Sequence, residues 1–194
     1  GIDIYVLCQK AAKYSPNPES KFKFMAEQLL SVEKVEGDLA DVGAYKGAVA
    51  LVMKALSKKD VHLFDTWKGM PEDDPLCHHR PGEWKADMDE CENLVGVDDR
   101  TLFWAGVFPE CVSGMDCFDG EKNAFSFAYV DLDGYQSTKN ALEWLWPRMA
   151  PGGKIVCDDI PWEACSGCEK AVREVFTREQ LQEFPMVNAV VVTK

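Results

Sequence analysis

Two pairs of aspartates follow apolar runs of the sequence, and together they could hold a metal ion. Asp131 and Asp133 come after the run FSFAYV, and Asp158 and Asp159 come after the run KIVC. Side chains alternate along a strand, so Asp131 and Asp133 leave the first strand on the same side. Neighbouring parallel strands lie about 4.8 Å apart, so acids at both strand ends can converge on one point.

Carboxylates that converge in a partly buried place repel one another and lose hydration. They must raise their pKa values or hold a cation between them. A set of oxygen ligands alone favours a hard ion such as Mg²⁺, whereas zinc prefers nitrogen or sulfur. Acids at two consecutive strand ends therefore predict a magnesium site.

Two other interpretations of these acids are open. The acids could cap the helices that follow or lie in solvent, and Asp133, before GYQSTKNALEWL, is placed to do so. The pattern DLDG with a later DD also occurs in haloacid-dehalogenase phosphatases, where DLDG belongs to the first strand and a long fold follows. Only 61 residues follow Asp133 in this chain of 194, which disfavours the phosphatase.

An earlier stretch, DLADVGAYKGAVALVMKAL, has the pattern of a strand, a tight turn and a helix. Gly43 and Gly47 bracket the turn and allow the backbone to approach a ligand. Asp41 could accept hydrogen bonds from a sugar hydroxyl or an amine. The Gly-x-Gly-x-x-Gly fingerprint of dinucleotide sites is absent, so the acid before a glycine turn favours S-adenosylmethionine, a cationic ligand without phosphate. Glycines are also common at any strand-to-helix turn.

The next strand ends in Asp65, about 20 residues after the glycine turn, where an acid usually binds the hydroxyl pair of a ribose. Trp67 follows within the stretch VHLFDTWKGMP. Its ring could pack on a purine or on a segment above the site, and a core position fits it equally.

Short apolar runs alternate with helical patterns from Gly37 onward, which predicts βαβ units and a mostly parallel sheet covered on both faces. The expected strands are Asp38–Val42, Val61–Phe64, Thr101–Trp104, Phe125–Asp131 and Lys154–Cys157, followed by FPMV and AVVVTK as an antiparallel hairpin at one side. Ligands of such sheets bind outside the carboxyl ends of the strands. We expect one α/β domain over residues 1–194.

Two segments lie outside this alternation. Residues 1–36 read as a loosely ordered opening through YSPNPES and then an amphipathic helix in KFKFMAEQLLSVEKVEG. Residues 71–99, hereafter the insertion segment, are polar and rich in Pro, Asp and Glu. Because this segment follows a strand end, we expect it to overhang the site as a lid. The alternative is a solvated insertion without contact to substrate.

The composition fits a soluble protein, with 46% hydrophobic and 28% charged residues. The net charge of −12 argues against nucleic acid and anionic membranes as partners. We find no apolar stretch of the roughly 20 residues that a membrane span needs and no signal peptide in GIDIYVLCQK, so we expect a cytoplasmic location. The eight scattered cysteines favour reduced, buried thiols over a disulfide framework.

Cys165 and Cys168 form a Cys-x-x-Cys pattern, which elsewhere indicates redox chemistry or zinc. Zinc would need a second pair of ligands, and only Cys77, His78 and His79 of the insertion segment offer one. Cys168 also belongs to an apolar helical stripe, which favours a structural role. We expect His78 and His79 to be solvated, although one of them could reach the acceptor as an alternative base.

Several of these stretches, taken in order, resemble the macrocin O-methyltransferase (TylF-type) family. They are GDLADVGAYKGAVA, FDTWKGMPEDD, GVFPECV, YVDLDGYQSTKNALEWLWPRMAPGGKIVCDDI and CSGCEKAV, between about Gly37 and Ala171. The resemblance implies a Rossmann-like class I methyltransferase fold with a seven-stranded sheet. It also implies Mg²⁺-dependent methyl transfer from S-adenosylmethionine to a hydroxyl, often one of a glycosylated natural product.

The resemblance assigns roles to particular residues. It implies that Asp131, Asp158 and Asp159 ligate the metal and that Asp133 is the general base. The expected cofactor residues are Asp41, Gly43, Ala44, Tyr45, Gly47, Asp65, Thr66 and Trp67. The expected partner is a small molecule with an acceptor hydroxyl, and a homodimer is left open.

The chain departs from the family at a few positions. Tyr129 stands where the family commonly has His, Gly134 replaces a usual Leu, and Lys68 replaces a Glu. The N-terminal extension of many members is short. These changes concern the acceptor side, so a catechol-like phenol remains an alternative acceptor, and a cofactor-binding module without turnover remains an alternative function.

Overall fold

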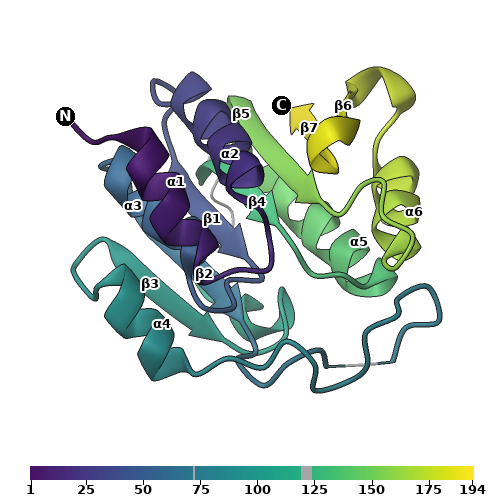
Figure 1. The fold of residues 1–194 in the computed structure, drawn as a ribbon. Helices are drawn as coiled ribbons and strands as arrows, with labels where there is room; N and C mark the ends of the chain where they lie inside the picture. The colour runs from purple at the N-terminus through teal and green to yellow at the C-terminus, as the bar shows by residue number, and fades with distance from the viewer. Residues whose placement is uncertain (72, 119–123) are drawn as a thin grey trace.

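The structure, a computed structural model, describes residues 1–71, 73–118 and 124–194. Its centre is a seven-stranded sheet in the order β3-β2-β1-β4-β5-β7-β6, in which β7 runs antiparallel to β5 and to β6 and the other pairs are parallel. The strands are β1 Asp38–Val42, β2 Val61–Asp65, β3 Thr101–Ala105, β4 Phe125–Val130, β5 Met149–Asp158, β6 Leu181–Phe184 and β7 Ala189–Thr193. The predicted α/β class and mostly parallel sheet are confirmed (Figure 1).

Helices cover both faces of the sheet. They are α1 Ile4–Ala12, α2 Glu19–Ser31, α3 Ala48–Leu56, α4 Met88–Val95, α5 Tyr135–Leu145 and α6 Ser166–Val175. Four short 3₁₀ turns lie at Glu110–Val112, Trp146–Arg148, Arg178–Gln180 and Pro185–Val187. Buried residues of α1 to α4 form one core with alternate residues of the strands, and buried residues of α5 and α6 form a second core on the opposite face. Figure 1 shows α1, α2 and α3 side by side and α5 and α6 apart from them.

The C-terminal hairpin is antiparallel, as expected, but the strand before its turn begins and ends earlier than FPMV. β6 spans Leu181–Phe184, and Pro185–Val187 form a 3₁₀ turn. Proline fixes φ and cannot donate to a strand ladder, so the pairing stops at Phe184. Asn188, with a φ of 49°, then makes the reversal into β7. The prediction of a strand at FPMV was wrong.

The prediction of a loosely ordered N-terminal segment was also wrong, because Ile4–Ala12 form the helix α1. The Asp3 side chain accepts hydrogen bonds from the backbone N–H groups of Tyr5 and Val6, which satisfies donors that a helix start otherwise leaves free. Cys8 and Ala11, which belong to this helix, are buried. Part of the insertion segment is helical as well, since α4 follows the capping residue Asp87.

A close backbone contact joins β1 to the end of β4. A Cβ atom on Gly43 would lie 2.0 Å from the carbonyl oxygen of Asp131, and Gly43 has a φ of +90°. Both facts require glycine here, because an L-residue would be strained and would also collide with backbone. The Asp131 N–H donates to the carbonyl of Val42 over 2.9 Å, so the glycine turn and the first aspartate are held together.

Among the described helices, we find none with the length and apolar content that a membrane crossing requires.

Substituting Gly43 tests the contact between the two strand ends. Gly43→Ala should reduce the free energy of unfolding by about 3 kcal/mol or more, since steric overlap adds to the left-handed strain. Chemical denaturation measures this. Gly114 also has a positive φ but has open space around it, so Gly114→Ala should cost only about 1 kcal/mol. Equal losses in the two variants would contradict the close approach.

Candidate active site

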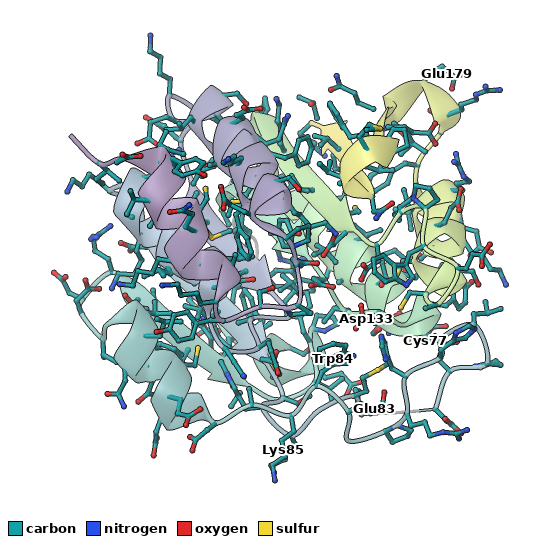
Figure 2. The ribbon with its side chains drawn as sticks, viewed as in Figure 1. Cys77, Glu83, Trp84, Lys85, Asp133 and Glu179 are labelled. Atoms are coloured by element: carbon teal, nitrogen blue, oxygen red, sulfur yellow. The ribbon has the colours of Figure 1, made fainter. Side chains whose placement is uncertain are left out.

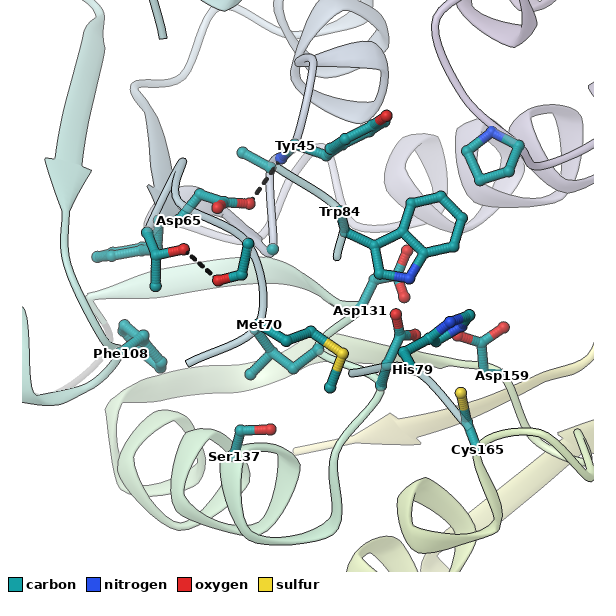
Figure 3. Close-up of a pocket in the computed structure, with 18 of the residues that line it drawn as sticks. Tyr45, Asp65, Met70, His79, Trp84, Phe108, Asp131, Ser137, Asp159 and Cys165 are labelled. Atoms are coloured by element: carbon teal, nitrogen blue, oxygen red, sulfur yellow. Dashed lines mark hydrogen bonds between the residues drawn. The ribbon is translucent and has the colours of Figure 1, made fainter. Parts of the chain in front are cut away.

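A pocket lies at the carboxyl ends of the parallel strands, where the sequence predicted a ligand. Its floor is formed by the loops after β1, β2, β3, β4 and β5. Its upper wall comes from the loop between α1 and α2 and from the insertion segment (Figure 3). The lining residues used below are Asn17, Gly43, Ala44, Tyr45, Asp65, Thr66, His79, Trp84, Asp131, Asp133, Asp159 and Cys165.

The glycine turn is fixed by Asp65 at the end of β2. One carboxylate oxygen of Asp65 accepts the Tyr45 N–H over 2.8 Å, and the other accepts the Trp67 N–H over 2.7 Å. A carboxylate oxygen can accept more than one hydrogen bond, so both oxygens retain capacity for a ligand in the pocket. Burial raises the pKa of Asp65. The carboxylate is therefore held in place and can accept hydrogen bonds from neighbouring hydroxyl groups.

The pocket wall includes five of the eight predicted cofactor residues: Gly43, Ala44, Tyr45, Asp65 and Thr66. The other three lie behind it. Asp41 is 1% exposed and accepts the Ala50 N–H of α3 over 3.1 Å. Gly47 caps α3 and faces Cys91 and Val95. Trp67 is buried and donates its indole N–H to the Tyr45 carbonyl over 3.0 Å, so it supports the turn from below.

The structure brings three of the four predicted acids together. Carboxylate oxygens of Asp131, Asp133 and Asp159 lie within 4.8 Å of one another, and all three residues line the pocket. Asp133 and Asp159 have φ angles of 64° and 61°. Such left-handed conformations are uncommon outside glycine and cluster at functional sites. These backbone turns aim the two side chains back toward Asp131.

The electrostatics of this group match those of a cation site. Burial, reinforced by the charges of Asp158, Asp159 and Asp133, holds the pKa of Asp131 well above its usual range. Burial and the neighbouring Asp159 raise the pKa of Asp133 to about 8. A divalent cation would remove this repulsion, and three carboxylates supply the hard oxygen donors that Mg²⁺ prefers. The residues present therefore fit a magnesium ion.

Asp158 is not part of this group of three, although its charge contributes more than that of either other acid to the raised pKa of Asp131. One of its oxygens forms a buried ion pair with Lys21 of α2, and the other accepts the side-chain N–H of Asn17 over 3.3 Å. Lys21 and Asp158 are only 4% and 3% exposed. The Asp159 N–H also donates to Asp158 over 2.9 Å. The N-terminal segment is thereby tied to the turn that carries Asp159.

The insertion segment contacts the pocket at several points. Pro71, His79 and Trp84 line the pocket, and the rings of Tyr45 and Trp84 meet edge to face with centroids 5.8 Å apart. The Trp84 indole N–H is buried and has no hydrogen-bond partner among the described residues. Figure 2 shows Trp84, Cys77 and Asp133 in one region at the end of the sheet. Glu72 of this segment lies outside the described residues.

The segment is also attached to the helices behind the acids. The Asp74 side chain accepts the Tyr135 N–H at the start of α5 over 2.5 Å. The His78 N–H donates to the Ala164 carbonyl over 2.8 Å, beside an isolated bridge between Cys77 and Cys165. These contacts hold the segment against the starts of α5 and α6.

Sequence reasoning missed the upper wall and the counter-charge of Asp158. Lys21 carries a signal that could have found it, because it shares a helix face with Met25 and Leu29, where a charged residue needs a partner. Tyr14, Asn17 and Trp84 carry no comparable signal. Their positions depend on how two segments fold over the sheet.

Removing Lys21 tests the buried ion pair. Lys21→Met should lower the free energy of unfolding by about 3–5 kcal/mol, because Asp158 is left buried without a cation. Thermal and chemical denaturation at neutral pH without added metal would measure the loss. The control is Lys23→Met on the same helix, since Lys23 pairs with Glu19 at the surface and should contribute less than about 1 kcal/mol. Similar losses in both variants would contradict the pairing.

Asp41 generates a prediction about pH. Burial, followed by the nearby Asp65, raises the pKa of Asp41 to about 8, and one of its oxygens has no partner among the described residues. The folded state then holds a proton that the unfolded chain releases near pH 4, so this group lowers stability as the pH rises from about 4 to about 8.

Denaturation of wild type and Asp41→Asn across this pH range measures the contribution of Asp41. The wild type should lose stability relative to the variant by up to about 1.4 kcal/mol per pH unit. Asp116→Asn at an exposed position should show no such difference. Parallel pH profiles for wild type and Asp41→Asn would rule out the raised pKa.

The chain is similar in sequence to known O-methyltransferases. A family model described as macrocin O-methyltransferase (TylF) matches residues 20–192. The chain is 27% identical over 164 residues to the 8-demethyl-8-(2,3-dimethoxy-alpha-L-rhamnosyl)-tetracenomycin-C 4'-O-methyltransferase of Streptomyces olivaceus, covering 74% of this chain and 60% of the relative. It is 24% identical to the demethyldecarbamoylnovobiocin O-methyltransferase of Streptomyces niveus, covering 72% and 58%. The chain therefore spans about three fifths of these relatives' length.

Solved structures agree on the fold. CalS11, a calicheamicin methyltransferase, superposes with a TM-score of 0.69 at 17% identity, over 100% of this chain and 97% of that one. The O-methyltransferase NovP gives a TM-score of 0.68 at 19% identity, over 89% and 78%. At these identities the agreement concerns the fold, which is that of the class I O-methyltransferases. Because the family model extends over residues 20–192 of 194, the chain belongs to the macrocin O-methyltransferase (TylF) family.

Proposed function

We propose that this chain transfers a methyl group from S-adenosylmethionine to a hydroxyl of a small molecule, namely a sugar of a glycosylated natural product, with the help of Mg²⁺. The observation that carries the proposal is the group of Asp131, Asp133 and Asp159 on the wall of a pocket that also contains the glycine turn and Asp65. The relatives' names support the acceptor class, since one acts on a rhamnosyl-tetracenomycin and another on mycinamicin III.

The cofactor would lie along the carboxyl ends of β1 and β2. Asp65 would accept hydrogen bonds from the ribose hydroxyls, because it lines the pocket and each of its oxygens has acceptor capacity left. The backbone at Gly43, Ala44 and Tyr45 would approach the rest of the molecule closely. S-adenosylmethionine supplies the methyl group, whose carbon is electrophilic because it is bonded to a positively charged sulfur.

The acids would divide into ligands and a base. Asp131 and Asp159 would hold the metal from the pocket side and Asp158 from behind, where it would share its oxygens with Lys21. Bound Mg²⁺ lowers the pKa of an acceptor hydroxyl and orients it. Asp158 is absent from the pocket wall and cannot reach an acceptor, whereas Asp133 lines the pocket. The Asp133 carboxylate would take the proton that the acceptor hydroxyl loses.

Methyl transfer is an in-line displacement, so the acceptor oxygen and the methyl carbon must be held together. The pocket is bounded above by Tyr14, Trp84 and Trp162. These aromatic faces would exclude water and pack against the acceptor, and the free indole N–H of Trp84 could donate to one of its oxygens.

The assignment is tested by measuring formation of S-adenosylhomocysteine with a panel of free and nucleotide-linked deoxysugars and a catechol, with Mg²⁺ or with chelator. We expect transfer to a sugar that chelator abolishes. Transfer to the catechol alone would show that the acceptor is a phenol and not a sugar. Cofactor binding by calorimetry without transfer to any acceptor would identify a binding module instead.

Three aspartate variants separate ligand from base. Asp131→Asn and Asp158→Asn should weaken Mg²⁺ binding at least about tenfold in calorimetry with little effect on cofactor affinity. Asp133→Asn should instead lower kcat by about 10²–10⁴ while metal affinity stays within a few-fold of wild type. If Asp133→Asn abolishes metal binding and Asp158→Asn does not, the two roles must be exchanged.

A further inference from the structure

His79, Asp133 and Cys165 form a second cluster of donor atoms that the proposed methyl transfer does not use as a unit. The ring nitrogen, carboxylate oxygen and sulfur of these residues lie within 4.8 Å of one another. All three residues line the pocket, so an ion can reach them from solvent (Figure 3). They come from three parts of the chain: the insertion segment, the loop before α5 and the loop before α6.

The chemistry of this cluster differs from that of the neighbouring acids. Asp131, Asp133 and Asp159 offer only oxygen, which favours a hard ion such as Mg²⁺. An imidazole, a thiolate and a carboxylate together are the ligands of zinc and of similar borderline-soft divalent ions. Asp133 belongs to both sets.

Cys77 lies beside the cluster, outside the three donor atoms that approach one another within 4.8 Å. Its sulfur is 3.7 Å from that of Cys165, and the two residues face each other across an isolated antiparallel bridge. Two thiolates bound to one tetrahedral zinc at about 2.3 Å each lie about 3.8 Å apart. The separation of these sulfurs fits that edge of a tetrahedron, whereas a disulfide requires about 2.05 Å.

We propose that His79, Asp133 and Cys165 form a second cation site for a borderline-soft divalent ion such as Zn²⁺, and that Cys77 moves toward the ion as the fourth donor. Each thiol that becomes a ligand loses its proton to the solvent. The ion would connect the insertion segment to the start of α6, since Cys77 and His79 lie on one and Cys165 on the other. In combination with the proposed function, it would also occupy the carboxylate of Asp133 and stop methyl transfer.

Co²⁺ is the probe for this site, because thiolate coordination gives it a near-ultraviolet charge-transfer band that oxygen ligands do not give. The full chain carries Cys117→Ser to remove an exposed thiol, and the buffer contains a phosphine reductant. No Mg²⁺ is added, because Asp133 belongs to both sets of donors. We expect one equivalent of Co²⁺ to bind with this band and Zn²⁺ to displace it. Cys165→Ser should abolish the band, and His79→Gln should weaken Co²⁺ binding at least tenfold.

A nearby residue of the same type serves as the control for each substituted ligand. His78→Gln and Cys168→Ser should retain the band and the affinity of the parent protein, since His78 and Cys168 lie outside the cluster. Circular dichroism checks that Cys165→Ser folds. His79→Gln, at a half-buried position, tests the site with a second variant that does not change a buried thiol. Absence of the band in the parent, or a band that survives both ligand substitutions, overturns the site. This readout does not depend on methyl transfer, so it can fail while the proposed function stands, and the reverse also holds.

Discussion

Mutual repulsion of carboxylates at the end of the sheet is the constraint on which the site depends. Four aspartates follow the neighbouring strands β4 and β5, and burial removes much of the water that would stabilise their charges. Lys21 is the only lysine or arginine that forms an ion pair with any of them in the part of the chain that the structure describes. One positive charge is too few for four carboxylates, so protons or a further cation must supply the rest.

This constraint links the N-terminal segment to the sheet. Lys21 and Asn17 both hold Asp158, and the loop between α1 and α2 forms part of the pocket wall. The insertion segment is attached on the other side by Asp74 and by the bridge between Cys77 and Cys165. The acceptor side is thus built from segments outside the sheet. Such segments vary more readily than strands, because they carry fewer of the contacts that hold the core.

Much of the fold could be predicted because strand and helix periodicities are local. Apolar runs predicted four of the five parallel strands to within one residue at each end, whereas β5 begins five residues earlier than the expected Lys154. Asp65 and Asp131 were placed at strand ends on that basis alone. The antiparallel pair at the C-terminus was predicted, although the effect of Pro185 on its first strand was not.

The remainder depends on side-chain direction and on contacts between distant segments. Strand periodicity does not say that Asp158 turns toward Lys21, which is 137 residues away, while Asp159 turns into the pocket. The contact between Cys77 and Cys165 spans 88 residues and depends on where the insertion segment crosses the chain. Rules based on the spacing of residues within one motif cannot find a site whose ligands come from two separate segments of the chain.

The backbone at Asp133 explains why two kinds of donor set meet at one residue. Asp133 has a φ of 64°, and its carboxylate lies within 4.8 Å both of the carboxylates of Asp131 and Asp159 and of the donor atoms of His79 and Cys165. Because one carboxylate belongs to both sets, the two sets are coupled: an ion that takes Asp133 in one set changes the charge that the other set presents. The strained turn after β4 is therefore the element through which the insertion segment and the acids of the sheet influence each other.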